Sequence, residues 1–249
     1  MKRGLIVRTV VGIILAAAVF VPVSRADVHI RQKQVIEPYY EYGVTNPARE
    51  QSLETWIGKD RASVINARWA VLIDFEAKKL IYLGHRTRVY AETELPFDSS
   101  ALYGPDALEV IKASLVQGTV KPLPETKTVM DRPCQGYEVM TWIDYEGDRA
   151  GDRKQVIWST TSIPIDAAIL DKILHLQYVL SYFSDDLIKA YETIKGFPLL
   201  RELTLCNRGI EIKARVETLE IAEQTPDAKV YAIPSGYSKK TKIDASDIR

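Results

Sequence analysis

Residues 144–152 hold the densest group of potential metal ligands in the chain. Four carboxylates recur there at short intervals: Asp144, Glu146, Asp148 and Asp152. Carboxylates at alternate positions begin the calcium loop of an EF-hand, but that loop also needs a central glycine and a bidentate glutamate at position 12. Here the glycines fall elsewhere, position 12 is Gln155, and basic residues balance the charge. The pattern favours a solvated hairpin turn, so we predict no metal site.

The other side chains with catalytic chemistry stand apart from one another. His29, His85 and His175 are the three histidines, and their spacing matches neither a metal site nor a nucleophile with its base. The chain contains no Gly-x-Ser-x-Gly, no phosphate-binding loop and no His-Glu-x-x-His. We therefore expect no enzyme activity, no catalytic residues and no cofactor.

The first 26 residues have the features of a secretory signal peptide. A basic start precedes an apolar run, and Ser24 and Ala26 place small residues at the −3 and −1 positions of a cleavage site. The apolar run of about 15 residues is shorter than the roughly 20 that a spanning helix needs. We expect cleavage after Ala26, no stable membrane span afterwards, and a soluble periplasmic or secreted protein rather than an anchored one.

Removing the signal peptide leaves an acidic chain. The whole sequence has 33 basic and 33 acidic residues, and four of the basic ones lie in residues 1–26. The remaining 29 basic and 33 acidic residues give a net charge of −4. Such a balance does not attract nucleic acid. We expect a single domain over residues 27–240 and a disordered tail over residues 241–249.

Cys134 and Cys206 are the only cysteines, and both follow the predicted signal peptide. Disulfides form and persist in exported proteins. A bridge requires the two Cα atoms to lie about 4.4 to 6.8 Å apart, which sequence spacing does not reveal. The sequence therefore leaves two alternatives, a Cys134–Cys206 disulfide or two separately buried thiols.

Residues 52–96 are typical of an antiparallel meander. Short apolar or β-branched runs alternate with polar clusters, and residues 69–75 and 88–95 each place apolar side chains on one parity. More strands are expected at residues 127–131, 135–145, 153–161, 199–206 and 209–223, with a bulge near Glu217 where the apolar parity changes. Residues 27–44 suggest a first edge strand broken by Pro38.

Two stretches have helical spacing. Residues 104–118 form a short amphipathic segment that begins at Gly-Pro-Asp. In residues 165–195 the apolar positions recur every three or four residues, and Ser184 resembles an internal N-cap, which predicts two consecutive helices. Such a wide apolar stripe must be buried. The fold class we expect is α+β and mainly β: a curved, unclosed antiparallel sheet whose concave face is covered by helices.

Strand parity predicts which side chains line that concave face. If the apolar face of the sheet is the ligand face, nine residues lie there beneath residues 169–180. They are Trp69, Val71, Ile73, Phe75, Tyr137, Val139, Ile143, Val156 and Trp158.

Several short motifs carry a resemblance to a known family. They are Trp-Ile-Gly-Lys-Asp-Arg at 56–61, Gly-Tyr at 136–137, Val-Ile-Trp-Ser at 156–159, Gly-Phe-Pro at 196–198 and Ile-Pro-Ser-Gly-Tyr at 233–237. Together they resemble an uncharacterised family of exported bacterial domains related to the LolA/LolB lipoprotein carriers. The resemblance implies an unclosed β half-barrel with helices in its concave side, which receives acyl chains in the characterised members.

The functional expectation is therefore a periplasmic binding or carrier protein for an apolar ligand, such as a lipid or a lipoprotein acyl chain. The alternative is a protein-interaction or envelope-sensor domain on the same scaffold, with an envelope protein as its partner and no small ligand. A large one-sided sheet with a helical cover provides a concave apolar site for a ligand. The same cover equally describes a sealed core.

Overall fold

The computed structural model describes residues 26–41, 43–145, 148–207, 209–244 and 247. The predicted signal peptide, apart from Ala26, lies outside the described residues, as do Glu146 and Gly147 of the carboxylate-rich turn. The fold is mainly β, with one large sheet and few helices. Its first eight strands are β1 (Asp27–Ile36), β2 (Tyr39–Glu41), β3 (Val44–Asn46), β4 (Arg49–Ile57), β5 (Arg61–Asn66), β6 (Trp69–Asp74), β7 (Lys79–Gly84) and β8 (Val89–Glu94). The others are β9 (Val116–Val129), β10 (Arg132–Tyr145), β11 (Asp148–Thr160), β12 (Phe197–Asn207), β13 (Ile210–Gln224) and β14 (Ser238–Lys239).

The large sheet consists of two antiparallel meanders joined side by side. One runs β1-β4-β5-β6-β7-β8, the other runs β9-β10-β11-β12-β13, and the pairing of β1 with β13 joins them. The short β14 adds to β8 in parallel, and β2 pairs with β3 in a separate hairpin. The outermost strands, β14 and β9, do not pair with each other, so among the described residues the sheet stays unclosed.

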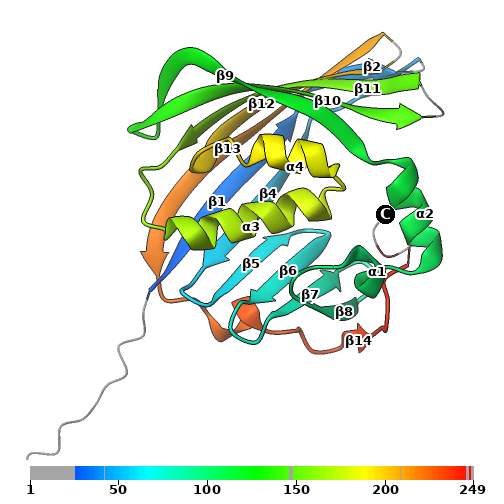
Figure 1. Cartoon of the computed structure of the whole chain (residues 1–249), viewed down its shortest axis with the longest axis vertical. Coiled ribbons are helices and arrows are strands. Elements are labelled where there is room, and N and C mark those ends of the chain that lie inside the picture. Colours follow the sequence, from blue (N-terminus) through cyan, green and yellow to red (C-terminus); the bar gives the residue numbers. More distant parts are fainter. Residues whose placement is uncertain (1–25, 42, 146–147, 208, 245–246, 248–249) are drawn as a thin grey trace, which may run out of the picture.

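The predicted antiparallel meander is confirmed in position. Val71 of β6 pairs with Val64 of β5 and with Tyr82 of β7, so apolar side chains meet on one face of three neighbouring strands. Opposed β-branched and aromatic pairs of this kind stabilise a sheet. Figure 1 shows the sheet curving round the helices of residues 167–191. We call the face toward those helices the inner face.

The prediction that residues 27–44 form an edge strand is wrong. Strand β1 lies in the middle of the sheet, paired with β4 along one side and with β13 along the other. It ends at Ile36, before Pro38, so the proline interrupts no ladder hydrogen bond. One edge of the sheet is β9, which begins earlier than the expected residue 127 and accommodates Pro122 and Pro124 because one side of it is unpaired.

The last long strand, β13, contains a bulge, as the change in its apolar parity predicted. The pairing of β1 with β13 shifts between Arg31 and Gln32, which pair with Glu220 and Thr218 and leave Leu219 as the extra residue. This bulge lies two positions from the predicted site near Glu217. It re-aims the strand, and the side chain of Leu219 is 43% exposed as a consequence.

Short helices accompany the sheet, and several of them begin at polar side-chain caps. They are α1 (Ser99–Leu102), α2 (Pro105–Ala113), α3 (Ala167–Leu180), α4 (Asp185–Tyr191) and the 3-10 helix η1 (Ala228–Tyr231). Asp166 accepts hydrogen bonds from the backbone amides of Ala168 and Ile169 at the start of α3, and Ser184 accepts one from Leu187 at the start of α4. The predicted division of residues 165–195 into two helices is therefore confirmed.

Two groups of buried residues pack the helices against the inner face. The larger contains Leu170, Ile173 and Leu174 of α3 together with side chains of β5 to β8 and of α1 and α2. The smaller contains Leu187 and Tyr191 of α4 with side chains of β9, β10 and β11. The turn between α3 and α4 is also tied to the sheet, because Val116 of β9 exchanges backbone hydrogen bonds with Tyr182 and Ser184.

The C-terminal segment crosses the outer face of the first meander. Ile233 and Tyr237 pack on a small cluster formed by Ala70, Leu72 and Leu83. Beyond it the structure differs from the disordered tail expected over residues 241–249. Ile243 is fully buried and its backbone amide donates to the Leu102 carbonyl. Because this apolar side chain has a place in the core, the described part of the tail is ordered by packing.

The structure contradicts a Cys134–Cys206 disulfide. Cys134 is buried, Cys206 is exposed, and neither is bonded. Register explains why: Gln135, next to Cys134, pairs with Ser159 at one end of β11, whereas Cys206 pairs with Asp152 near the other end. At about 3.4 Å per residue, the two positions are separated by on the order of 20 Å along the strand, too far for a bridge.

Thiol titration checks this correction. We expect one thiol of the native, unreduced protein to react quickly, namely Cys206, which is exposed. Cys134 should react only after unfolding, since burial both shields it and raises the pKa of its thiol, which leaves less reactive thiolate. Unfolded, unreduced protein should show two thiols, and finding none would restore the bridge.

Candidate functional site

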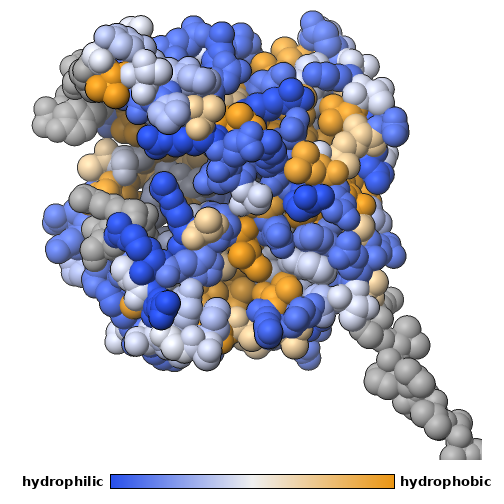
Figure 2. All heavy atoms as spheres, turned by 180° about the vertical axis from the view of Figure 1, so that it is seen from behind, coloured by the Kyte–Doolittle hydropathy of each residue, from blue (hydrophilic) through white to orange (hydrophobic). Residues whose placement is uncertain are grey.

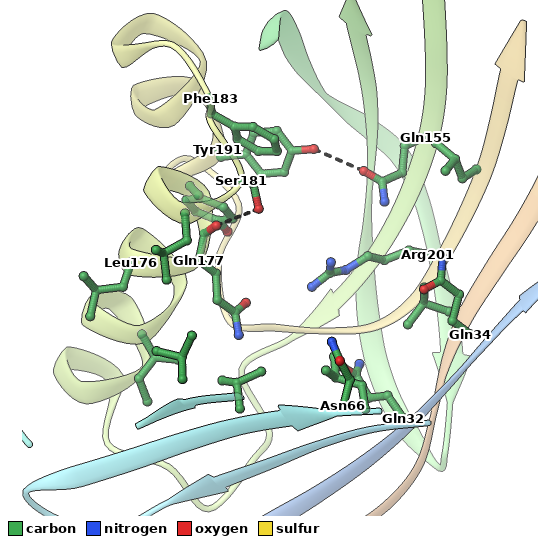
Figure 3. A pocket seen from close by; sticks show the side chains of 18 of the residues that line it. Gln32, Gln34, Asn66, Gln155, Leu176, Gln177, Ser181, Phe183, Tyr191 and Arg201 are labelled. Atoms are coloured by element: carbon green, nitrogen blue, oxygen red, sulfur yellow. Dashed lines mark hydrogen bonds between the residues drawn. The ribbon is translucent and has the colours of Figure 1, made fainter. Parts of the chain in front are cut away.

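A cavity of about 520 Å³ lies between helices α3 and α4 and the inner face of the sheet. This volume falls within the roughly 300 to 1,000 Å³ of typical small-molecule sites. Its apolar wall comes from both meanders and from the helices, including Leu53, Val64, Trp69, Val71, Ile73, Ile173, Leu176, Leu180, Phe183, Phe197, Leu203, Ala214 and Val216. Figure 3 shows α3 along one side and the strands of the second meander along the other.

The cavity reaches the surface at one end. Gln51, Arg153 and Ser181 belong to its lining and are exposed, whereas Val71, Ile73 and Ile173 at the other end are nearly inaccessible. The hollow is thus a blind pocket with a polar mouth and an apolar floor. Seen from the far side of the molecule, the surface is mostly hydrophilic with smaller groups of hydrophobic residues (Figure 2).

The structure places three of the nine predicted lining residues in the cavity wall: Trp69, Val71 and Ile73. Phe75, two residues further along the chain, packs at the edge of the larger core, and Lys172 lies above its ring. Phe75 does not line the cavity because β6 ends at Asp74 and Phe75 lies in the turn after it.

Three other predicted residues face the helices without reaching the cavity. Tyr137 and Val139 of β10 are buried against α4, and Ile143 packs at the edge of the same cluster. These residues lie on the inner face, as strand parity predicted. They do not line the cavity because α4 covers that part of the sheet. Tyr137 helps to position the helix, since its hydroxyl accepts a hydrogen bond of 3.4 Å from the backbone amide of Lys195.

Val156 and Trp158 lie on the opposite face from the one predicted. In β11 the cavity is lined by Gln155, and Ile157 is buried against α4, so the residues between them point outward. The Trp158 indole donates to Glu202 on the outer face, and Lys127 lies 5.4 Å above its ring. The prediction chose the wrong face because it assumed that the inward-facing residues of this strand are apolar, whereas Gln155 lies on the cavity wall.

Sequence reasoning missed the polar residues of the cavity. Amide and hydroxyl side chains line it from both meanders and from α3: Gln32, Gln34, Gln51, Asn66, Thr141, Gln155, Gln177 and Ser181. Figure 3 shows Gln177 of α3 and Arg201 of β12 pointing into the space between them. The repeated glutamine at alternate positions of β1, Gln32 and Gln34, is visible in the sequence, but it marks the cavity only once β1 is known to be a central strand.

Some of these polar groups have partners inside the protein. The Gln32 amide donates to the Thr218 hydroxyl and the Pro198 carbonyl, and the Gln51 amide donates to Gln34. The Tyr191 hydroxyl donates to the Gln155 side-chain oxygen at 3.1 Å. Gln177 makes no side-chain hydrogen bond with any described residue, which leaves its amide available to a ligand.

Two tyrosines contribute neutral hydroxyl groups to the wall. Burial raises the pKa of Tyr178 to about 12, against a smaller opposing effect of the Arg201 charge. Burial likewise raises the pKa of Tyr191 well above its usual range. Both phenols therefore stay protonated at neutral pH, and they can donate hydrogen bonds but carry no charge.

The charged side chains that line the cavity are all basic. Arg153 of β11 and Arg201 of β12 belong to the lining, and no aspartate or glutamate does. Neither guanidinium forms an ion pair or side-chain hydrogen bond with a described residue, and the Nε of Arg201 is buried without a partner. Buried donors are nearly always satisfied, so this unmatched group calls for an explanation.

Each of the three histidines has its own neighbours. His29 stacks on Trp56 with ring centroids 4.1 Å apart, His85 meets the Tyr237 hydroxyl at 2.7 Å, and His175 lies 2.9 Å from Glu192. At the carboxylate-rich turn, Asp152 pairs with Arg149. Within the described ranges, no three potential ligands come close enough to hold a metal ion. Nor does any helix in that part of the chain have the length and apolar character to cross a membrane.

Comparison with known proteins gives little guidance. No family model matches the chain, and no curated protein matches it. Among solved structures, it is similar to a candidate outer membrane lipoprotein-sorting protein domain from Vibrio parahaemolyticus, at 9% identity and a TM-score of 0.28. That similarity covers 83% of this chain and 89% of the other. It is too weak to carry an argument about fold or function.

Proposed function

We propose that this protein is an exported binding or carrier protein for an apolar ligand with a long hydrocarbon chain, such as a lipid or a lipoprotein acyl chain, and that it acts in the periplasm without catalysis. The observation that carries the proposal is the cavity of about 520 Å³ between the helices and the sheet. Close-packed interiors contain few voids larger than a water molecule, so a space of this size is not ordinary packing.

The shape of the cavity supports a ligand with one polar end. Its floor is formed by apolar side chains of β6 and α3, such as Val71, Ile73 and Ile173, and its mouth is polar. A hydrocarbon chain buried on that floor gains about 0.8 kcal/mol per methylene group. A polar end would stay near the amides and the solvent.

The proposal also explains the helical cover. In it, α3 and α4 form the cover of a LolA-like half-barrel whose concave side takes the ligand. The Val116 amide donates to the Tyr182 carbonyl and the Ser184 amide donates to the Val116 carbonyl, which holds the turn between the helices to β9. The other end of α3 has no such backbone tie to the sheet among the described residues, and loading can occur by movement of that helix. The signal-like residues 1–26 support export.

Titration with a fluorescent fatty acid tests the proposal. We expect the purified mature protein, residues 27–249, to take up cis-parinaric acid with a dissociation constant in the micromolar range or below, and palmitate to displace it. Displacement controls for adsorption to the outer surface. If neither uptake nor displacement occurs at micromolar concentrations, the carrier proposal fails and the protein-interaction alternative gains.

A further inference from the structure

The two arginines of the cavity lie on neighbouring strands and share a neighbour. Arg153 pairs with Leu205 and Arg201 with Ile157 in the β11–β12 ladder, so both project from the second meander toward the helices. Both act electrostatically on Tyr191 of α4, which also lines the cavity. Figure 3 shows Arg201 extending across the cavity toward Gln177.

The surroundings of these arginines lack any internal counter-charge. No carboxylate among the described residues lies within 4 Å of either guanidinium, although the chain after residue 26 is acidic overall. Arg215, on the outer face of β13, pairs with Glu217, so arginines elsewhere on this sheet do find partners. Arg153 is exposed to solvent, but Arg201 is half-buried, and an unpaired cation in such a place is costly and normally paired or coordinated.

The groups near Arg201 can also donate hydrogen bonds. The amide of Gln177 has no partner among the described residues, and the phenol of Tyr178 is protonated, whereas the Tyr191 hydroxyl already donates to Gln155. A cation flanked by neutral donors, with no acidic group in the wall, is the arrangement that binds a carboxylate or phosphate.

We infer that the cavity takes an amphiphile with a single hydrocarbon chain and an anionic head group, whose anion binds Arg201 with Arg153 at the mouth while the chain lies on the apolar floor. This rests on the proposed function and names its ligand class. The anion comes either from a free fatty acid or from a phosphate-bearing lipid; both present oxygens that a guanidinium can hold in two parallel hydrogen bonds.

A comparison of three ligands with the same chain length tests the inference on the wild-type protein. They are palmitate, palmitoyl lysophosphatidic acid and hexadecanol, each measured by displacement of a neutral fluorescent lipid probe. We expect at least one anion to bind about tenfold or more tightly than the neutral alcohol, the usual scale of a charge-assisted contact. The stronger of the two anions identifies the source of the head group.

Substitution then assigns the effect to the arginines. Arg201→Gln and Arg153→Gln should each weaken binding of the preferred anion by about 10-fold or more and leave hexadecanol within about twofold. Arg201→Lys, which keeps the charge, should restore part of the affinity. Arg215→Gln is the matched control, with the same change of charge on the outer face of the adjoining strand, and it should alter neither ligand.

The outcomes are distinguishable. Equal binding of the anions and hexadecanol by the wild-type protein overturns the head-group inference and leaves the carrier proposal standing. A preference for anions that Arg201→Gln and Arg153→Gln do not reduce also overturns it. No binding of any of the three overturns the carrier proposal itself. If Arg201→Gln does not fold, the comparison of the three ligands on the wild-type protein and the affinities of Arg153→Gln still test the inference.

Discussion

Replacing Gly196 by alanine is expected to lower the free energy of unfolding by at least about 3 kcal/mol, among the largest losses for a single methyl group. Gly196 has a φ of +81°, where an L side chain is strained. A Cβ there would also overlap the carbonyl group of Thr160 and lie 2.8 Å from the Thr161 amide nitrogen. Both obstacles are backbone atoms, so no rotamer change relieves the clash.

The position matters for the site because Gly196 lies in the connection from α4 to β12, immediately before β12 begins. The residue before it, Lys195, accepts a hydrogen bond from the Ser159 hydroxyl through its carbonyl, which fixes this junction to β11. A displaced junction would shift the strand that carries Arg201. Thermal and urea unfolding followed by circular dichroism measure the loss.

Gly236→Ala is the matched control for Gly196→Ala. Gly236 has a φ of +84°, yet an added Cβ would meet nothing within 4 Å. Gly236→Ala should therefore lower the free energy of unfolding by the conformational strain alone, about 1 to 2 kcal/mol. If the two variants lose the same stability, the close approach of β11 to residue 196 is not the cause.

Filling the cavity is expected to abolish ligand binding while the fold survives. Ala214 lies on β13 opposite Leu203, and both line the cavity. Because Ala214 pairs with Ile36, two residues beyond Gln34 toward the mouth, the indole of Ala214→Trp would fill the cavity between the mouth and the apolar floor. The hydrocarbon chain could then not reach the floor, so we expect affinity for palmitate to fall at least about 100-fold, the loss of roughly 3 kcal/mol of apolar burial. The change in stability should stay within about 1 to 3 kcal/mol, since the added atoms enter an existing space.

A graded series makes this prediction specific to volume. Ala214→Val adds two methyl groups and should weaken palmitate binding by much less than tryptophan does, with a melting temperature close to the wild type. Wild-type affinity in a folded Ala214→Trp would show that the ligand binds elsewhere. The measurements are displacement titrations and thermal melts of the same preparations.

Local patterns in the sequence predicted most of the framework. Alternation at residues 69–75 and 88–95 placed the strands of the first meander, and Ser184 marked the break between α3 and α4. The bulge near Glu217 followed from a change of parity within one strand. These features depend on neighbours in the chain, where period and capping are decisive.

Strand order lay beyond the local patterns. Strand β1 became central because β13, almost 200 residues later, pairs along its free side, and no local signal reports such a partner. The separation of Cys134 from Cys206 has the same origin, since it is set by the register of β11 against two different strands. Pairing between distant segments is a property of the whole fold.

The candidate site was only partly predictable, and for a physical reason. Parity reasoning assumes an apolar inner face, which holds at Val71 and Ile73 but fails in β11 and β12, where Gln155 and Arg201 face inward. Polar residues on the inner side of these two strands reverse the expected pattern, and the proposed binding of a polar head group would account for the reversal.

Native mass spectrometry of the mature protein tests the central claim most directly, namely that the space between α3, α4 and the sheet holds a hydrocarbon-chain ligand. After incubation with an excess of palmitate and removal of the free lipid, we predict a population heavier than the apoprotein by one palmitate. That population should be absent from Ala214→Trp. The apoprotein mass alone in the wild-type sample, or equal palmitate adducts on both proteins, would contradict the account.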